Sequence, residues 1–190
     1  MRFARSILAF SAMAWLMTVS ASADQAAPTT GRSIASLAHI PLMSRQGAAV
    51  QLGSRVASGK PTLIAVWASW CPPCVAEAPY LDKARKDLGK SYNFLYINRR
   101  EGNPDPDQPA DQVAQFLDRA GLSDVDYLVA DVRAYQQIVG ADFKDIPQGK
   151  VGIPRLYLFD AEGRQVYTSY GFDEAEGAQL EQRIKRAMTK

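Results

Sequence analysis

The feature that most constrains this chain is a pair of cysteines placed where an apolar strand runs into a helix. Cys71 and Cys74 are the only cysteines in the 190 residues, and they enclose two prolines. The apolar run at 62–68 is typical of a buried strand, and the segment from Val75 to about Leu88 has the pattern of a helix. The sequence therefore predicts a strand–turn–helix unit with both sulfurs at the start of the helix.

This position favours reactive thiols over purely structural ones. The unpaired N–H groups at a helix start carry partial positive charge, which favours a thiolate and lowers the cysteine pKa. Pro72 and Pro73 fit the first helical turn, because their missing N–H groups would have no helical partner there. A Cys-x-x-Cys motif in this setting is typical of a dithiol that cycles with a disulfide.

Other uses of the motif fit less well. A structural zinc site needs four ligands, and the one histidine, His39, is far away in the sequence. Covalent haem attachment needs a histidine after the second cysteine, where this chain has Val75. A structural disulfide across so short a loop would add little stability. Two hypotheses stay open beside redox chemistry: a Cu(I)-handling dithiol, and an interaction protein whose disulfide is only structural.

The first 23 residues have the pattern of a secretory signal peptide. Arg2 and Arg5 precede an apolar stretch of 13 residues, Ile7 to Val19, and small residues at 21–23 form a cleavage site. The apolar stretch is short for a membrane span, which needs about 20 residues, so we expect cleavage after residue 23. The alternative is an uncleaved segment that anchors the protein to the inner membrane. Export leads to a compartment where disulfides persist, and we expect the periplasm.

The chain that remains after this cleavage is electrically neutral. It has 167 residues, with 20 basic and 20 acidic side chains. A neutral protein gives no electrostatic reason to bind nucleic acid. We also expect the protein to be a monomer. We expect residues 24–38 to form a flexible leader, because they are small and polar at their start, and residues 39–190 to form one domain.

Strand and helix patterns alternate along this domain. The apolar periodicity and the turn residues predict hairpins at 40–52 and at 155–160 with 164–170, strands at 62–68, 91–98 and 127–130, and helices at 75–88, 110–120, 131–139 and 174–188. This order predicts an α/β fold with a mixed central sheet flanked by helices.

The chain resembles the thioredoxin superfamily, and within it the exported TlpA/ResA-like branch of thiol–disulfide oxidoreductases. The resemblance rests on Trp70-Cys71-Pro72-Pro73-Cys74, on Glu77 and Pro79 in the following helix, and on Gly152-Ile153-Pro154 before a strand. It implies a thioredoxin-like fold with an N-terminal β-hairpin and a short helical insertion. It also implies that no dissociable cofactor is needed, because the redox-active Cys71–Cys74 disulfide carries two electrons.

The resemblance assigns catalytic roles to three residues. It makes Cys71 a nucleophile near the surface and Cys74 the more buried, resolving thiol. Thioredoxin has a buried aspartate where this chain has Ala65, and the exported branch has instead an acidic residue on the active-site helix, as Glu77 here. We expect Glu77 near Cys74 and Val66, with a pKa raised by burial and suited to proton transfer. The alternative is an exposed Glu77 that only complements the helix dipole.

The resemblance also predicts a substrate surface. It makes Pro154 a cis-proline beside the sulfurs, where the backbone of Ile153 can pair with an extended peptide. Trp70 and Pro72 would add exposed apolar surface beside the cysteines. Arg155 departs from the small polar residue that commonly follows this proline, so the substrate preference of the chain is open.

The resemblance implies a reductant of specific protein disulfides, for example in cytochrome c maturation or in the upkeep of copper-site thiols. Its partners would be a protein thiol or disulfide substrate and a membrane thiol reductase as electron donor. A thiol oxidase or isomerase is the alternative. A dedicated oxidase more often resembles the DsbA type, which has an inserted helical domain, whereas residues 99–126 hold one predicted helix and a loop.

Overall fold

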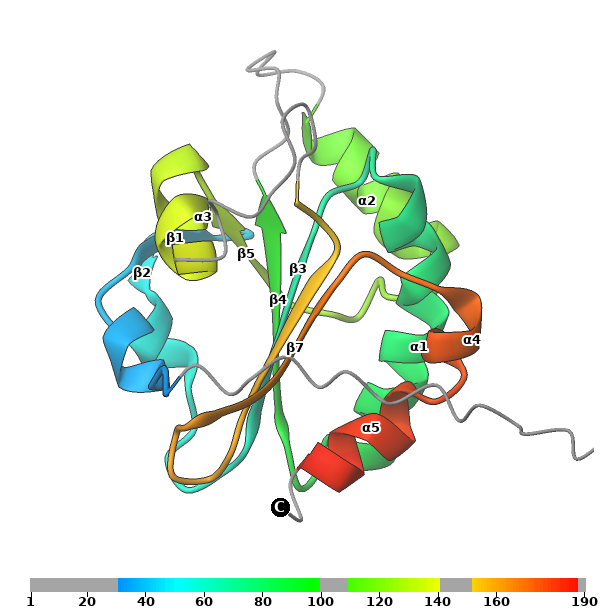
Figure 1. The fold of residues 1–190 in the computed structure, drawn as a ribbon. Helices are drawn as coiled ribbons and strands as arrows, with labels where there is room; N and C mark the ends of the chain where they lie inside the picture. The colour runs from blue at the N-terminus through cyan, green and yellow to red at the C-terminus, as the bar shows by residue number, and fades with distance from the viewer. Residues whose placement is uncertain (1–30, 100–108, 141–151, 188–190) are drawn as a thin grey trace, which may run out of the picture.

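The computed structural model describes residues 31–99, 109–140 and 152–187, and these form a layered α/β fold (Figure 1). One seven-stranded sheet has the order β2-β1-β5-β4-β3-β6-β7. Strands β3, β4 and β5 are parallel, and the remaining neighbours are antiparallel. The strands are β1 (Pro41–Ser44), β2 (Ala49–Gln51), β3 (Thr62–Trp67), β4 (Asn93–Arg99), β5 (Tyr127–Ala130), β6 (Arg155–Phe159) and β7 (Gln165–Tyr170). The predicted mixed sheet is confirmed.

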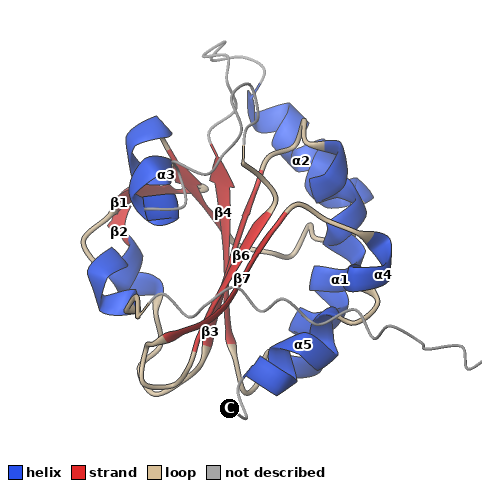
Figure 2. Cartoon of the chain, in the orientation of Figure 1, coloured by secondary structure: helices blue, strands red, loops and turns tan. Residues whose placement is uncertain are grey.

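Helices cover both faces of this sheet (Figure 2). Helices α1, α2, α4 and α5 lie on one face, to the right in Figure 1, and α3 lies on the other. Their bounds are α1 (Pro72–Leu88), α2 (Pro109–Arg119), α3 (Val132–Val139), α4 (Glu174–Gly177) and α5 (Leu180–Ala187), and two 3-10 helices are η1 (Ile34–Leu37) and η2 (Leu52–Arg55). The fold is thioredoxin-like, with the N-terminal hairpin β1–β2 and the inserted helix α2, as predicted.

Strand β3 forms the rigid base of the cysteine motif. All six of its residues are buried, because helices cover both faces and strands flank both edges. The ring of Trp67, at its end, stacks on Phe116 of α2 with centroids 4.5 Å apart and meets Tyr127 of β5 edge-on. Trp67 is therefore a core residue that fixes the chain four residues before Cys71.

Local signals in the sequence placed most element ends correctly. Helix α3 begins where the Asp131 carboxylate accepts a hydrogen bond from the Ala134 N–H at 2.7 Å, and it ends at Gly140. In the hairpin predicted at 40–52, the Gly47 N–H donates to the Ser44 carbonyl at 2.9 Å and closes the turn between β1 and β2. These contacts lie within a few residues, so the sequence alone was enough to predict them.

Two predicted boundaries differ from the structure. Residues 34–37, expected in the leader, form η1 with Leu37 in the core, because the Ile34 N–H donates to the Gly163 carbonyl at 2.8 Å and attaches this turn to the distant β6–β7 hairpin. The closing helix is two helices, α4 and α5, because Gly177, a poor helix former, packs against Phe172 at the break. The signal peptide and the leader up to residue 30 lie outside the described residues and stay predictions.

None of the helices within residues 31–99, 109–140 and 152–187 is long and apolar enough to span a membrane.

Candidate active site

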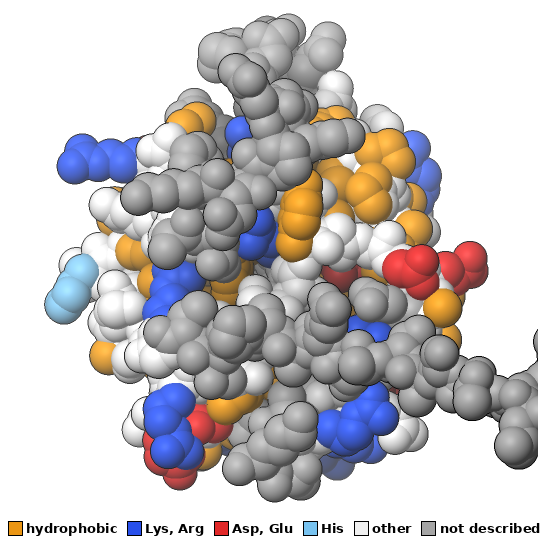
Figure 3. All heavy atoms as spheres, viewed as in Figure 1, with side chains coloured by type: hydrophobic (Ala, Val, Ile, Leu, Met, Phe, Trp, Pro, Cys, Tyr) orange, Lys and Arg blue, Asp and Glu red, His pale blue; other side chains and the backbone are white. Residues whose placement is uncertain are grey.

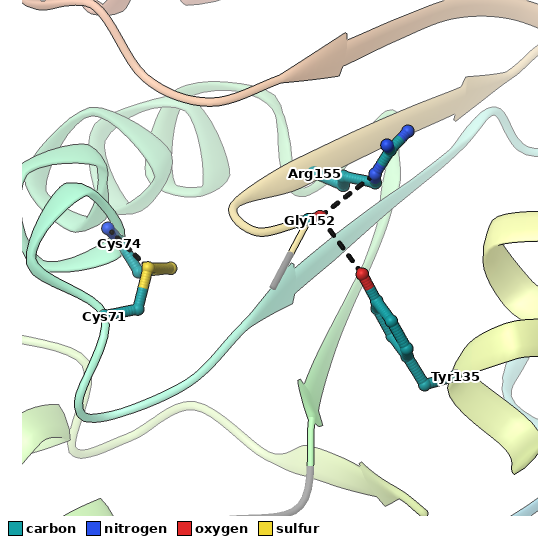
Figure 4. The surroundings of a disulfide bond; sticks show 5 residues. All are labelled: Cys71, Cys74, Tyr135, Gly152 and Arg155. Atoms are coloured by element: carbon teal, nitrogen blue, oxygen red, sulfur yellow. Dashed lines mark hydrogen bonds between the residues drawn. A yellow bond between two sulfur atoms is a disulfide. The ribbon is translucent and has the colours of Figure 1, made fainter. Parts of the chain in front are cut away.

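Cys71 and Cys74 form a disulfide at the start of α1, with their Cα atoms 5.2 Å apart. Cys71 is the N-cap of the helix, and its Sγ accepts a hydrogen bond from the Cys74 N–H at 3.3 Å (Figure 4). Because Pro72 and Pro73 have no N–H, this is the first donor that the helix can offer. The same donor and the positive end of the helix dipole would stabilise a thiolate at Cys71.

Both cysteines are buried in the disulfide form. The exposed fraction is 3% for Cys71 and 2% for Cys74. The expectation that Cys71 lies nearer the surface is therefore wrong for this form, because its Sγ turns back over the helix start toward Cys74. The exposed surface here belongs to Trp70, which is 41% exposed, and to Pro72 and Val75. Figure 3 shows hydrophobic side chains gathered on the side of the molecule where α1 and α2 lie.

The Gly152–Pro154 segment lies at the same end of the sheet as the disulfide (Figure 4). The Ile153–Pro154 peptide bond is cis, as predicted. Arg155 pairs with Val66 across β6 and β3, so Pro154 adjoins the end of β3 that runs into α1. Ile153 and Pro154 are both buried, unlike Trp70. The fold thus brings together two motifs that are about eighty residues apart in the sequence.

The carbonyl of Gly152 is held by two side chains (Figure 4). The Tyr135 hydroxyl of α3 donates to it at 3.2 Å, and Arg155 Nε donates to it at 3.0 Å. Sequence reasoning noticed Arg155 only as a departure from a family pattern. It missed Tyr135, because a side chain on a separate helix reaches this carbonyl only once the sheet has formed.

Glu77 lies one turn after Cys74 on α1 and is 3% exposed. Burial raises its pKa from 4.5 to about 8. Within the part of the chain that the structure describes, its carboxyl has no hydrogen bond or ion pair to offset this burial. The prediction of a buried Glu77 with a raised pKa is confirmed, and the alternative of an exposed helix-start carboxylate is wrong.

Glu77 borders a cavity of about 20 Å³ on the α1 face of the sheet, which is enough for one water molecule. The residues around it come from strands β6 and β7, helix α5 and the segment between them: Leu156, Tyr167, Ser169, Gly171, Phe172, Gly177, Leu180 and Arg183. Leu156 pairs with Ala65, so Ala65 shares this face, whereas the next residue, Val66, points to the other face. The expectation that Val66 neighbours Glu77 is therefore wrong, because the residue of β3 on the Glu77 face is Ala65, one position earlier in the strand.

Sequence reasoning also missed Tyr96 of β4. It pairs with Ala65 and so lies on the Glu77 face of the sheet. Burial raises the pKa of its phenol, and the charge of Glu77 adds to this rise. Among the described residues, the Tyr96 hydroxyl has no hydrogen-bond partner, and no cluster of three or more His, Cys, Asp or Glu side chains could hold a metal ion.

Solved structures share this fold. The thioredoxin domain of a thiol-disulfide oxidoreductase from Bacteroides vulgatus is similar with a TM-score of 0.58 and 18% identity, over 84% of this chain and 98% of that chain. A secreted Mycobacterium tuberculosis disulfide oxidoreductase, described as homologous to E. coli DsbE, is similar with a TM-score of 0.53 and 20% identity, over 78% of this chain and 96% of that chain.

Curated proteins resemble the chain in sequence. The thiol:disulfide interchange protein CycY of Rhizobium leguminosarum is 32% identical over 138 residues, which are 69% of this chain and 61% of that protein. The thiol:disulfide interchange protein DsbE of Vibrio cholerae is 30% identical over 113 residues, or 60% of this chain and 51% of that protein. The chain thus matches between half and two thirds of the length of these relatives. A family model named Redoxin matches residues 22–184, which is most of the chain, and the chain therefore belongs to the Redoxin family.

Proposed function

We propose that this chain is an exported thiol–disulfide oxidoreductase that reduces specific protein disulfides. The observation that carries the proposal is the Cys71–Cys74 disulfide at the start of α1, with the Cys74 N–H directed at Cys71 Sγ. Relatives named as thiol:disulfide interchange proteins support the same activity. The redox pair itself supplies two electrons, so the reaction calls for no dissociable cofactor.

The reaction uses Cys71 as nucleophile and Cys74 as resolving thiol. The Cys71 thiolate attacks one sulfur of a substrate disulfide, and the other substrate sulfur leaves as a thiolate. Cys74 then loses its proton and attacks Cys71 Sγ, which releases the second substrate thiolate and leaves the Cys71–Cys74 disulfide. The substrate gains two electrons and the cysteine pair loses them, so a separate reductant must restore the dithiol.

Glu77 takes the proton from Cys74 in this scheme. It is buried one helical turn from Cys74, and its pKa of about 8 lies close to the pKa of an ordinary thiol. A base with such a pKa accepts the thiol proton at little cost in free energy. Two neighbouring acidic groups titrate as a coupled pair, so Glu77 and Cys74 share their apparent pKa values.

The substrate binds along the surface between Trp70 and the Gly152–Pro154 segment. Trp70 and Pro72 are exposed beside the buried sulfurs and offer apolar contact to a protein partner. The backbone N–H and C=O of Ile153 have no hydrogen bond among the described residues, so an extended segment can pair with them as with a sheet edge. Pro154 fixes the turn that presents Ile153.

The substrates proposed are periplasmic protein disulfides, for example in cytochrome c maturation or in copper-site thiol upkeep, with a membrane thiol reductase as electron donor. Export rests on the signal-peptide pattern of residues 1–23, and one protein of similar fold is itself described as secreted. An N-terminal anchor in the inner membrane is the alternative location.

The reduction potential of the Cys71–Cys74 pair, measured against glutathione, tests the direction of electron flow. A reductase should lie near the value of thioredoxin, about −270 mV. A value near that of a strong oxidant, about −120 mV, would favour the alternative of an oxidase or isomerase. Tight Cu(I) binding by the reduced pair without any disulfide exchange would instead favour a copper-handling dithiol.

A further inference from the structure

Arg155 is a buried cation at the segment that faces the disulfide. It follows Pro154 and is 5% exposed. A buried charge is costly unless hydrogen bonds and other contacts compensate it. Its Nε donates to the Gly152 carbonyl at 3.0 Å, and its Cζ lies 4.8 Å from the centre of the Tyr170 ring. The planar guanidinium thus stacks on an aromatic ring while one edge donates to the backbone, a combination that suits arginine and not lysine.

Tyr135 approaches the same carbonyl from another element. Its hydroxyl, at the end of a side chain from α3, donates to the Gly152 oxygen at 3.2 Å. The Cζ of Arg99 lies 4.8 Å from the centre of the Tyr135 ring and holds that ring from the side of β4. Burial raises the pKa of the Tyr135 hydroxyl, so the group keeps its proton and remains a donor. One carbonyl therefore joins α3 to the beginning of β6.

The peptides on either side of Ile153 are both anchored. Gly152, with a φ of +67°, has the left-handed conformation that favours glycine, and its carbonyl receives the two side-chain donors. The Pro154 carbonyl accepts a hydrogen bond from the Gly171 N–H at 2.9 Å. Ile153 itself has no backbone hydrogen bond among the described residues. The two anchored peptides thus hold Ile153 from both sides, while its own N–H and C=O groups have no hydrogen bond to the described residues.

We infer that Arg155 and Tyr135 are positioning residues that hold the Gly152 carbonyl so that the backbone of Ile153 stays ready to pair with an extended substrate segment. Neither side chain touches substrate in this role. The inference rests on the proposed function and adds to it a reason why this chain has arginine after the cis-proline. A preformed strand edge spares the substrate complex the entropy cost of ordering the loop, so the effect falls on substrates that have a backbone to pair.

The test compares a linear peptide disulfide with bis(2-hydroxyethyl) disulfide, which has no peptide backbone. The reduced full-length protein and its R155T, R155K and Y135F variants react with each probe. For R155T we expect the second-order rate constant with the peptide to fall about tenfold, as loss of a charge-assisted hydrogen bond allows, and the constant with the small disulfide to stay unchanged. For R155K we expect a similar loss, because lysine keeps the charge but lacks the fork.

Y135F removes the second donor to the Gly152 carbonyl, the Tyr135 hydroxyl, and keeps the aromatic ring beside Arg99. It therefore shows how much the second hydrogen bond to this carbonyl adds to that of Arg155. We expect a smaller loss of about threefold with the peptide, and a non-additive effect in the double variant R155T/Y135F. The pH profile of Cys71 alkylation, measured on each variant, should match that of the wild type near neutral pH. Thermal unfolding should show that each variant is folded at the assay temperature, although R155T loses the buried contacts of Arg155 and is therefore less stable than the wild type.

Three results would overturn the inference. Equal slowing with both probes would mean that the variants damage the thiolate or the fold, and an unchanged peptide rate would mean that the anchors do not matter. Full activity of R155K would mean that charge, and not hydrogen-bond geometry, is what Arg155 supplies. A wild-type protein that reduces neither probe would instead contradict the proposed function, which keeps the two failures apart.

Discussion

Two buried ionisable residues, Arg155 and Glu77, lie near the disulfide on opposite faces of the sheet, and they differ in the partners that surround them. Arg155 is 5% exposed and Glu77 is 3% exposed. Arg155 has the Gly152 carbonyl and the Tyr170 ring as partners. Glu77 has no hydrogen bond or ion pair among the described residues and borders a cavity the size of one water molecule.

The difference follows from the acid–base chemistry of the two groups. A guanidinium keeps its charge at any working pH, so a fold that buries it must provide partners. A carboxyl can give up its charge by binding a proton, and burial without partners then raises its pKa instead of unfolding the protein. Arg155 is therefore a fixed part of the structure, whereas Glu77, with a pKa of about 8, can change its charge during a reaction.

Arg155 and Glu77 both lie near the disulfide of Cys71 and Cys74, and the largest expected effect on disulfide exchange comes from replacing these cysteines. Cys71→Ser should abolish disulfide exchange, because no second thiolate lies at the helix N-cap. Cys74→Ser should leave a nucleophile without its resolving thiol, so a mixed disulfide with a partner should accumulate. Non-reducing electrophoresis with and without reductant would detect it. Trapping by Cys71→Ser and not by Cys74→Ser would reverse the two roles.

The second largest expected effect is on the pH dependence of the free energy of unfolding, which should depend on Glu77 and not on Arg155. The pKa of Glu77 is raised from 4.5 to about 8 in the folded state, so the folded protein binds this proton more tightly than the unfolded chain. The stabilisation of the folded state by this bound proton is fully present below pH 4.5, the ordinary pKa of a glutamate, and is lost as the pH rises through about 8, the pKa of Glu77 in the folded protein. Between them, the free energy of unfolding should fall by about 1.4 kcal/mol for each pH unit.

Urea unfolding of wild type, Glu77→Gln and Arg155→Met across this pH interval measures that slope. Glu77→Gln should remove the part of the slope that this carboxyl contributes, because glutamine has no proton to lose. Arg155→Met should be less stable than the wild type at every pH, because it removes the hydrogen bond to Gly152 and the contact with Tyr170, and it should keep the slope, because it leaves the Glu77 carboxyl in place. A slope that survives Glu77→Gln would show that this carboxyl is not the titrating group.

A more moderate effect concerns the thiols themselves. Glu77→Gln should change the pH dependence of cysteine alkylation in the reduced protein, because a Glu77 carboxylate opposes a thiolate at Cys74. With that negative charge removed, Cys74 should lose its proton at lower pH than in the wild type. Alkylation rate against pH, resolved for each cysteine by mass spectrometry, provides the measurement. Superimposable curves for the two proteins would exclude Glu77 as a proton acceptor.

The smallest effect concerns the aromatic partner of Arg155. Tyr170 is partly exposed, so Tyr170→Leu should remove a cation–π contact worth about 0.5–1 kcal/mol in the free energy of unfolding. The hydrogen bond from Arg155 to Gly152 should remain, and with it most of the activity toward a peptide disulfide. A loss of activity as large as that of R155T would mean that the ring, and not the hydrogen bond, keeps Arg155 in place.

Several parts of the fold and the site were predictable because their causes lie within a few residues of one another. The strand before Cys71, the prolines of the first helical turn and the Asp131 cap of α3 are of this kind. The cis bond at Pro154 was predictable for a different reason, the resemblance to a known family. The end of the leader and the break between α4 and α5 were missed, because tertiary packing of Leu37 and Gly177 decides them.

The sequence by itself determined where the reactive sulfurs lie along the chain, which helix start they occupy, and that the sheet is mixed, because these follow from local periodicity and capping. Only the tertiary structure decided what surrounds them. It joined Tyr135 and Arg155 at the Gly152 carbonyl and placed Ala65 and not Val66 on the Glu77 face. It also buried Glu77 where none of the described residues offers it a hydrogen bond or an ion pair. Strand register and desolvation are properties of elements that are distant in sequence, and neither can be calculated until those elements are packed together.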